Sequence, residues 1–301
     1  MKKTVLLFLA IWAHICSAQT TSWTGLTSTS WNNAANWTAG IPASSVDAII
    51  GDANFTGAFQ PNVNSISRCK SLTIGNAATT ATLTIAKNLT VSGTVTIGAN
   101  GTVSHSGSNT TITVKGNWSN SGSYVVTPAN SGVTFSGTAQ TLSGATTFQK
   151  LTINSGSILT LDANITVNAA LSVTGTLDPT ASFALSGTGS TNINSGGVLL
   201  IKAATFAGNH TMSGSISING SSTVNYAASA IAQTISNALT YGYLRISGGN
   251  VKTLAGNLPP LSTGSSNGRI YIDAGTLDLQ TYTANRGAGG GGAFTIAAEA
   301  I

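Results

Sequence analysis

The segment Leu159-Thr-Leu-Asp-Ala-Asn-Ile-Thr-Val-Asn-Ala-Ala-Leu-Ser-Val173 places an apolar residue at every sixth position, at Leu159, Ile165 and Leu171. Each of these residues opens a triplet in which two apolar side chains flank a Ser or a Thr. In an extended strand, residues i and i+2 point to one face and residue i+1 points to the other. Each triplet therefore predicts a short strand with two aliphatic side chains inward and one hydroxyl outward.

The six-residue step recurs along the chain. It forms three runs, which consist of Leu83, Leu89 and Val95, of Leu159, Ile165, Leu171, Leu177 and Phe183, and of Leu200, Phe206, Met212, Ile218 and Val224. Gly, Asn, Ala and Ser fill the intervals, and several of these residue types favour bends. The pattern predicts many short strands joined by tight turns.

A longer repeat contains these triplets. Residues 140–165 align without a gap on residues 233–258 at an offset of 93, and eleven of the 26 positions are identical. Strands of such short length cannot form a stable meander, but stacked coils bury a continuous apolar column. We therefore predict a parallel β-helix over residues 65–301, with roughly ten coils of about 18 to 25 residues. A β-sandwich is the alternative, and it would require longer strands and clearer hairpin turns.

Composition excludes most other fold classes. Charged residues make up 6% of the 301 residues, and Ser, Thr, Asn and Gly make up nearly half. Helical surfaces are rich in Glu, Lys, Arg, Gln and Ala, and this chain has a single Glu. The hydrophobic fraction of 41% argues against disorder. An all-β protein remains.

Residues 1–18 resemble a secretory signal peptide. Lys2 and Lys3 precede an apolar stretch that is too short to span a bilayer, and small residues follow at positions 16–18. Removal of this peptide would lower the formal net charge from +5 to +3 and leave Cys69 as the only cysteine. We therefore expect an exported protein without an intramolecular disulfide. Its scattered charges do not predict binding to nucleic acid, and no later segment predicts a transmembrane span.

Residues 19–64 form a separate tryptophan-rich module. Trp23, Trp31 and Trp37 lie close together in the sequence and are followed by a Gly-Ile-Pro turn. Exposed indoles would form a platform for sugar rings, whereas buried indoles would cap the open end of the apolar column. The cap is the interpretation that we favour.

These features resemble a known class of proteins. The Trp-x-Gly, Trp-Asn, Asn-Trp and Gly-x-Pro elements of residues 23–42, with the two blocks that begin at Gln140 and Gln233, look like secreted surface proteins of Bacteroidetes-type bacteria. Such proteins are similar to filamentous-haemagglutinin and autotransporter-passenger adhesins. The resemblance implies a right-handed parallel β-helix and, in many members, a C-terminal domain for type IX secretion. This chain lacks that domain, and we expect it to be a fragment of a longer protein.

The chain contains few groups that could perform catalysis. His105 and His210 lie in bend-like sequences and are expected to be solvated turn residues. Asp273 and Asp278 are the closest late pair of carboxylates, and they would have to meet across a bend to act as a hydrolase pair. We expect no catalytic residue, no cofactor and no metal site.

The sequence therefore predicts a structural or adhesive function. An exported rod covered with hydroxyl groups would contact glycans or matrix over a broad face, with end-to-end self-association as a further mode of assembly. Aromatic residues in the bends are candidate contacts, and these are Trp118, Tyr124, Tyr243 and Tyr282. Packing between coils is the alternative role for these rings. A β-helix enzyme that degrades polysaccharides is the alternative function.

Overall fold

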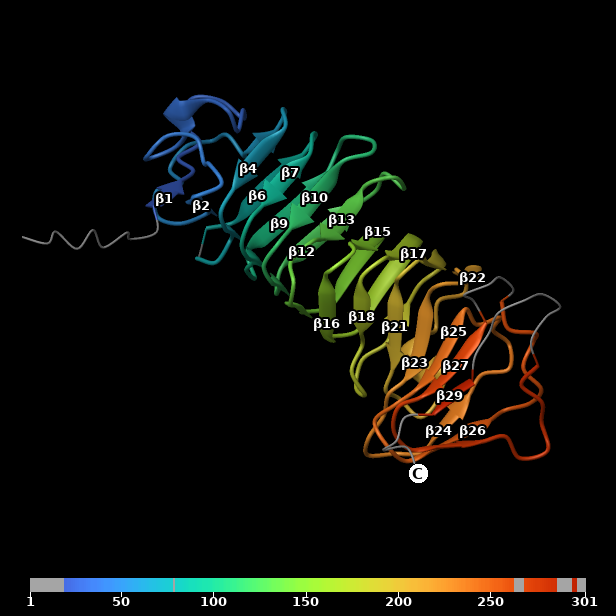
Figure 1. Cartoon of the computed structure of the whole chain (residues 1–301). Helices are drawn as coiled ribbons and strands as arrows, with labels where there is room; N and C mark the ends of the chain where they lie inside the picture. Colours follow the sequence, from blue (N-terminus) through green and yellow to red (C-terminus); the bar gives the residue numbers. More distant parts are fainter. Residues whose placement is uncertain (1–18, 78, 263–267, 286–293, 297–301) are drawn as a thin grey trace, which may run out of the picture.

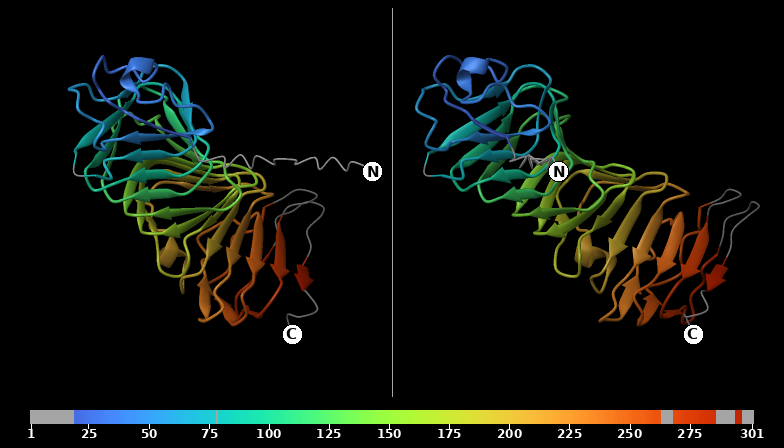
Figure 2. Two further views of the ribbon diagram at one scale, coloured as in Figure 1. Left: turned by 90° about the vertical axis from the view of Figure 1, so that its left-hand side faces the viewer. Right: turned by 60° about the vertical axis from the view of Figure 1, so that its left-hand side comes forward.

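Short strands stack into a parallel β-helix of about 11 turns in the computed structural model. Figures 1 and 2 show the coils following one another from the N-terminal to the C-terminal end of the molecule. The structure describes residues 19–77, 79–262, 268–285 and 294–296. The parallel β-helix is confirmed, and the β-sandwich alternative is wrong because every pairing between the named strands in this part of the chain is parallel. The predicted signal peptide lies outside the described residues.

One sheet of 13 strands runs through the whole rod. In spatial order its strands are β1 (Gln19–Ser22), β2 (Val46–Ile50), β5 (Leu72–Ile74), β8 (Val95–Ile97), β11 (Trp118–Asn120), β14 (Gln140–Ser143), β16 (Ile158–Asp162), β18 (Thr176–Asp178), β21 (Val198–Ile201), β23 (Thr223–Tyr226), β25 (Tyr243–Ile246), β27 (Arg269–Ile272) and β29 (Phe294–Ile296). Each strand contributes one rung, so consecutive coils are joined along the entire length of the rod.

Three shorter sheets complete the coils. The nine-stranded sheet contains β4 (Ser67–Cys69), β7 (Leu89–Val91), β10 (Thr111–Val114), β13 (Gly132–Phe135), β15 (Thr146–Ile153), β17 (Ile165–Val173), β19 (Leu185–Ser186), β20 (Ser190–Ile193) and β22 (Ile216–Ile218). The four-stranded sheet contains β3 (Asn62–Val63), β6 (Ala81–Ile85), β9 (Gly101–His105) and β12 (Ser123–Val126). The three-stranded sheet contains β24 (Gln233–Ile235), β26 (Val251–Leu254) and β28 (Thr276–Asp278). The coils that begin at β2, β5, β8 and β11 therefore contribute strands to three sheets, and the coils that begin at β14 to β27 contribute strands to two.

The triplets behave as predicted. In β5, Leu72 and Ile74 are fully buried and Thr73 faces outward between them. Leu171 and Val173 likewise flank the outward Ser172 in β17. Stacking of such triplets in register produces one continuous hydrophobic core along the axis.

The coil length varies more than the six-residue step predicts. The coil from Leu159 to its partner Leu177 is short, whereas the coil from Gln19 to its partner Val46 is half as long again. The strands predicted from the third run of the six-residue step are therefore partly wrong. Leu200 points outward between the buried Leu199 and Ile201 of β21.

Phe206 of the same run begins a short helix, α1 (Phe206–Asn209), instead of a strand. The Thr205 side chain accepts a hydrogen bond from the N–H of Gly208, and this cap starts the helix. Because turns such as this one differ in length, the number of residues between successive strands varies and the apolar period is interrupted.

Buried amides connect neighbouring coils in both copies of the long repeat. Gln140 Nε2 donates to the carbonyl oxygens of Val114, at 3.1 Å, and of Gly116. Gln233 Nε2 donates in the same way to Ile201 and Ala203, at 2.9 and 2.7 Å. The identical glutamines of the repeat thus have the same local role.

The matched asparagines Asn164 and Asn257 also correspond. Each side-chain oxygen accepts a hydrogen bond, at 2.9 Å, from a backbone N–H of the following coil. The two copies nevertheless occupy different sheets, because Gln140 lies in the 13-stranded sheet and Gln233 in the three-stranded sheet. The offset of the repeat is therefore not a whole number of coils.

The three tryptophans of residues 19–64 lie inside the N-terminal end of the rod. Trp23 and Trp31 are fully buried and Trp37 is 5% exposed. Trp37 contacts both other indoles edge-on, with ring centroids 5.0 and 4.8 Å apart, and its Nε1 donates to the Trp31 carbonyl oxygen. Burial contradicts an exposed sugar platform, and the strands β1 and β2 of this segment belong to the 13-stranded sheet.

The helical segments of the described residues are η1 (Ala34–Asn36) and α1. Neither is long and apolar enough to pass through a membrane.

Candidate functional site

Two of the four predicted aromatic contacts belong to the core. Trp118 is fully buried in β11, and Tyr124 in β12 is 8% exposed. Their rings meet edge-on at 5.1 Å, and both pack against Phe148. These residues stack between coils, so they are not available to a glycan.

The two histidines are also buried, which contradicts the prediction of solvated turns. His105 ends β9, and its ring nitrogens lie 2.7 Å from Thr110 Oγ1 and 3.0 Å from the Tyr124 hydroxyl. His210 Nε2 lies 2.8 Å from Thr191 Oγ1. Burial lowers the pKa of each histidine to about 4, because the charged imidazolium would lose its hydration. At neutral pH both imidazoles are therefore uncharged, and they act as hydrogen-bonding groups inside the rod.

The remaining two aromatics lie nearer the surface. Tyr282 is half-buried and packs against the edge of the core. Tyr243 is half-buried on the outer face of β25, where the inward position is taken by Leu244. Tyr243 lies at a place on the outer face of the described 13-stranded sheet where bulky aromatic and cationic side chains are clustered.

Four side chains make up this place, which we call the Tyr–Arg patch: Tyr243 and Arg245 of β25, and Arg269 and Tyr271 of β27. The two strands are neighbours near the C-terminal end of the rod (Figure 1). Their register sets Tyr243 beside Arg269 and Arg245 beside Tyr271. Because residues i and i+2 share a face, all four side chains project to the same outer surface.

The patch is held by contacts among its own members. The rings of Tyr243 and Tyr271 are in edge-to-face contact with centroids 5.8 Å apart. Arg269 Nη1 donates a hydrogen bond of 3.2 Å to the Tyr271 hydroxyl, and this bond raises the pKa of Arg269 above its ordinary value. Arg245 forms an ion pair with Asp273, which follows β27 directly. The cluster therefore carries two arginines against one carboxylate.

On the side of the preceding coil, the described neighbours of the patch are uncharged. The preceding coil places Thr223 beside Tyr243 and Asn225 beside Arg245. The chain has only four arginines and six tyrosines, so two of each on adjacent strands is a marked local concentration. An aromatic and cationic surface of this kind fits a ligand with an apolar ring face and a negative charge.

The predicted carboxylate pair is not assembled as a pair. Asp273 is engaged by Arg245, whereas Asp278 ends β28 in another sheet and accepts a hydrogen bond from the N–H of Gln280 at 2.8 Å. The ion-pair partner of Asp273 is Arg245 of the neighbouring strand. In the part of the chain that the structure describes, no three His, Cys, Asp or Glu side chains come together in a metal-binding group.

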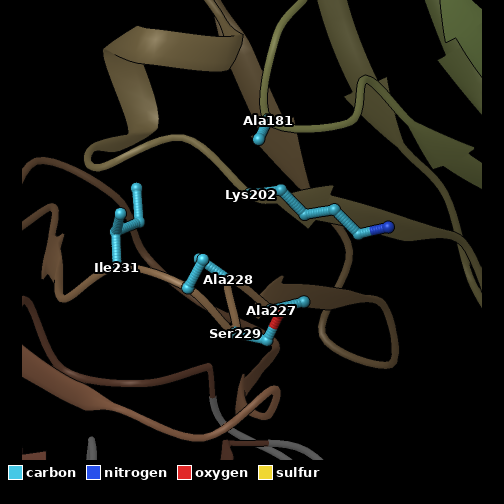
Figure 3. A pocket seen from close by; sticks show the side chains of 7 residues that line it. Ala181, Lys202, Ala227, Ala228, Ser229 and Ile231 are labelled. Carbon is cyan, nitrogen blue, oxygen red and sulfur yellow. The ribbon is translucent and has the colours of Figure 1, made fainter.

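A hollow of about 280 Å³ lies elsewhere on the rod and is lined by Ala181, Lys202 and residues 227–231. Figure 3 shows Ala227, Ala228 and Ser229 on one side of it and Ala181 on the other, with the Lys202 side chain extending away from Ile231. The Lys202 ammonium is paired with Asp178 at 2.7 Å. The lining thus offers mainly methyl groups and no uncommitted charge.

No protein-family model, curated protein or solved structure matches this chain. The geometry of its own residues therefore carries the functional argument. Sequence reasoning named Tyr243 but missed Arg245 and Tyr271 as its neighbours. The sequence pattern that could have indicated the patch is a pair of triplets, Tyr243-Leu-Arg245 and Arg269-Ile-Tyr271. In each triplet an apolar residue stands between two large polar residues, and the two triplets lie one coil apart.

Proposed function

We propose that this protein is an exported, adhesin-like structural rod whose outer surface contacts glycans or matrix. The rod is rigid because inward aliphatic residues of successive coils form one core. The resemblance to Bacteroidetes-type surface proteins is part of the same proposal. Export and surface exposure follow from the predicted signal peptide.

The observation that carries the proposal is a row of outward side chains on the nine-stranded sheet. Successive strands place small polar residues directly opposite one another, and the row runs through Thr90, Thr113, Thr134, Thr152, Ser172, Asn192 and Ser217. Neighbouring members are about 4.8 Å apart, the spacing of strands in a sheet. A polymer lying along the rod would meet a hydrogen-bonding group at every coil.

Such a row suits an extended partner better than a small molecule. Hydroxyl groups donate and accept hydrogen bonds, so they complement the hydroxyl-rich surface of a glycan. Individual contacts of this type are weak, and affinity would come from many of them along one face.

The test is binding of the purified full-length protein to arrayed glycans and to immobilised matrix proteins. A matched variant carries Thr113→Val, Thr134→Val and Thr152→Val, which keep the shape of the side chain and the β propensity but remove three hydroxyls of the row. The control variant carries Thr82→Val, Thr84→Val and Thr102→Val on the four-stranded sheet. Weaker binding by the first variant alone would support the proposal for this face.

Absence of binding to every glycan and matrix protein would leave only a spacer. Release of new reducing ends from a polysaccharide would instead favour the alternative, a β-helix enzyme.

A further inference from the structure

We propose that the Tyr–Arg patch is a binding site for an acidic sugar unit of a polysaccharide, one that carries a carboxylate or a sulfate. This inference rests on the proposed function and specifies the class of glycan and the place where it binds. Each half of the patch supplies one part of the recognition.

The aromatic half provides a surface for the sugar ring. Tyr243 and Tyr271 come from adjacent coils and meet edge-to-face at 5.8 Å, so together they span two rungs of the sheet. A tyrosine combines an apolar ring with a polar hydroxyl, and a sugar combines an apolar face of C–H groups with polar edges. The two surfaces are complementary.

The cationic half provides the charge. Arg269 donates to the Tyr271 hydroxyl through Nη1 only, and its Nε is shielded from solvent without a hydrogen-bond partner. Among the ion pairs of the described residues, none involves Arg269. A guanidinium binds carboxylate and sulfate-like oxyanions through two parallel N–H donors. A ligand oxyanion would accept from the outward N–H groups of the Arg269 guanidinium, whereas the shielded Nε would stay outside this contact.

Arg245 adds to the field at the same point. It is half exposed and shares its charge with Asp273, so the patch retains one net positive charge. One charge is sufficient to select an acidic sugar over a neutral one. It is too small for nucleic acid, which is recognised by stripes or clusters of basic residues.

The patch is also preorganised. Its four side chains stand on strands whose inward residues Leu244 and Ile270 are 0% and 4% exposed. Strands anchored in this way hold the outward groups in fixed positions, which reduces the entropy lost on binding.

The experiment measures binding of the full-length protein to three polymers by isothermal titration calorimetry at low salt. Polygalacturonate carries carboxylates, chondroitin sulfate adds sulfates, and dextran is neutral. We expect Arg269→Gln to weaken binding of an acidic polymer at least tenfold and Arg269→Lys to weaken it less. Lys87→Gln, at an exposed position between β6 and β7 and outside the row of the nine-stranded sheet, is the matched control and should leave binding unchanged.

The possible outcomes separate the acidic-sugar site from glycan binding in general. Equal affinity of the wild type and the Arg245→Gln, Arg269→Gln double variant for the acidic polymers would overturn the inference. Binding of dextran alone would also overturn it while leaving the proposed function standing. Failure to bind any of the polymers in this assay or any glycan in the array would overturn glycan binding altogether. The two acidic polymers distinguish a carboxylate from a sulfate as the preferred group.

Discussion

Lys252 is a buried cation in the interior of the last coils. Its side chain is fully buried, and its ammonium donates to the carbonyl oxygens of Ala228, at 2.7 Å, and of Gly249. Register places it directly opposite the buried Gln233 of the preceding coil. Burial lowers its pKa from 10.5, because the charged form loses hydration and carbonyls compensate only in part.

Replacement Lys252→Gln should reduce the pH dependence of stability at alkaline pH. The folded chain releases this proton at lower pH than the unfolded chain, so the wild type gains stability as pH rises toward 10.5 and loses it as pH falls through the folded-state pKa. The variant keeps amide donors, as in Gln233, and lacks this gain. Urea unfolding at pH 7 and pH 10 measures the difference, and an identical change of stability with pH in both proteins would contradict the expectation.

The buried histidines make the rod sensitive to acid. Their pKa in the folded state is about 4 against 6.5 when unfolded. The free energy of unfolding is therefore not reduced by these histidines above pH 6.5. It falls as the pH drops from 6.5 toward 4, by up to about 3 kcal/mol for each histidine. His105→Gln should show a shallower loss between pH 6.5 and 4 in urea titrations. An unchanged acid profile in this variant would show that His105 does not titrate in this range.

At the scale of the strand, the triplet was readable from sequence and the turn was not. The pattern at Leu72-Thr-Ile74 fixes which side chains point inward, because the side-chain period of a strand is 2 whatever its neighbours are. Leu200 and Phe206 broke the six-residue step because the turns differ in length and one contains α1. Turn length depends on local hydrogen bonds, such as those of the buried amides, which a period does not record.

Gln140→Leu should destabilise the protein by about 3 kcal/mol, because it leaves buried partners of the amide without a hydrogen bond. Its Oε1 accepts from the N–H of Gly137, and its Nε2 serves two carbonyls of the preceding coil. Gln149→Leu is the control, since that amide is only half-buried and makes one bond of 3.2 Å to Val126. Denaturant midpoints compare the two variants, and similar losses would mean that burial of the amide is unimportant.

At the scale of the whole rod, each coil contacts only its neighbours, so stability is distributed along one dimension. The candidate site illustrates the limit of sequence reasoning at this scale. Arg245 lies beside Tyr271, and Arg269 beside Tyr243, only because the coil between β25 and β27 has the length that sets this register. The coil that joins Gln19 to Val46 is half as long again as the one that joins Leu159 to Leu177, so no fixed period predicts which residues meet. The pairing of each arginine with a tyrosine of the neighbouring coil therefore required the structure.

Trp31→Ala should loosen the N-terminal coils selectively. Removal of a fully buried indole costs about 3 to 5 kcal/mol locally, and nearest-neighbour coupling confines the effect to adjacent coils. Hydrogen exchange should show lost protection in β2 and β5 and unchanged protection in β21. Uniform loss along the rod would indicate a single cooperative unit instead.

The hydrogen bonds between coils run along the long axis of the rod, and this direction governs its response to tension. A pull on the two ends loads the interfaces between coils in series, so they separate one after another rather than together. Each released coil adds roughly 60 to 90 Å of extended chain. A surface tether built in this way would lengthen in steps under shear and limit the force that reaches its bound partner.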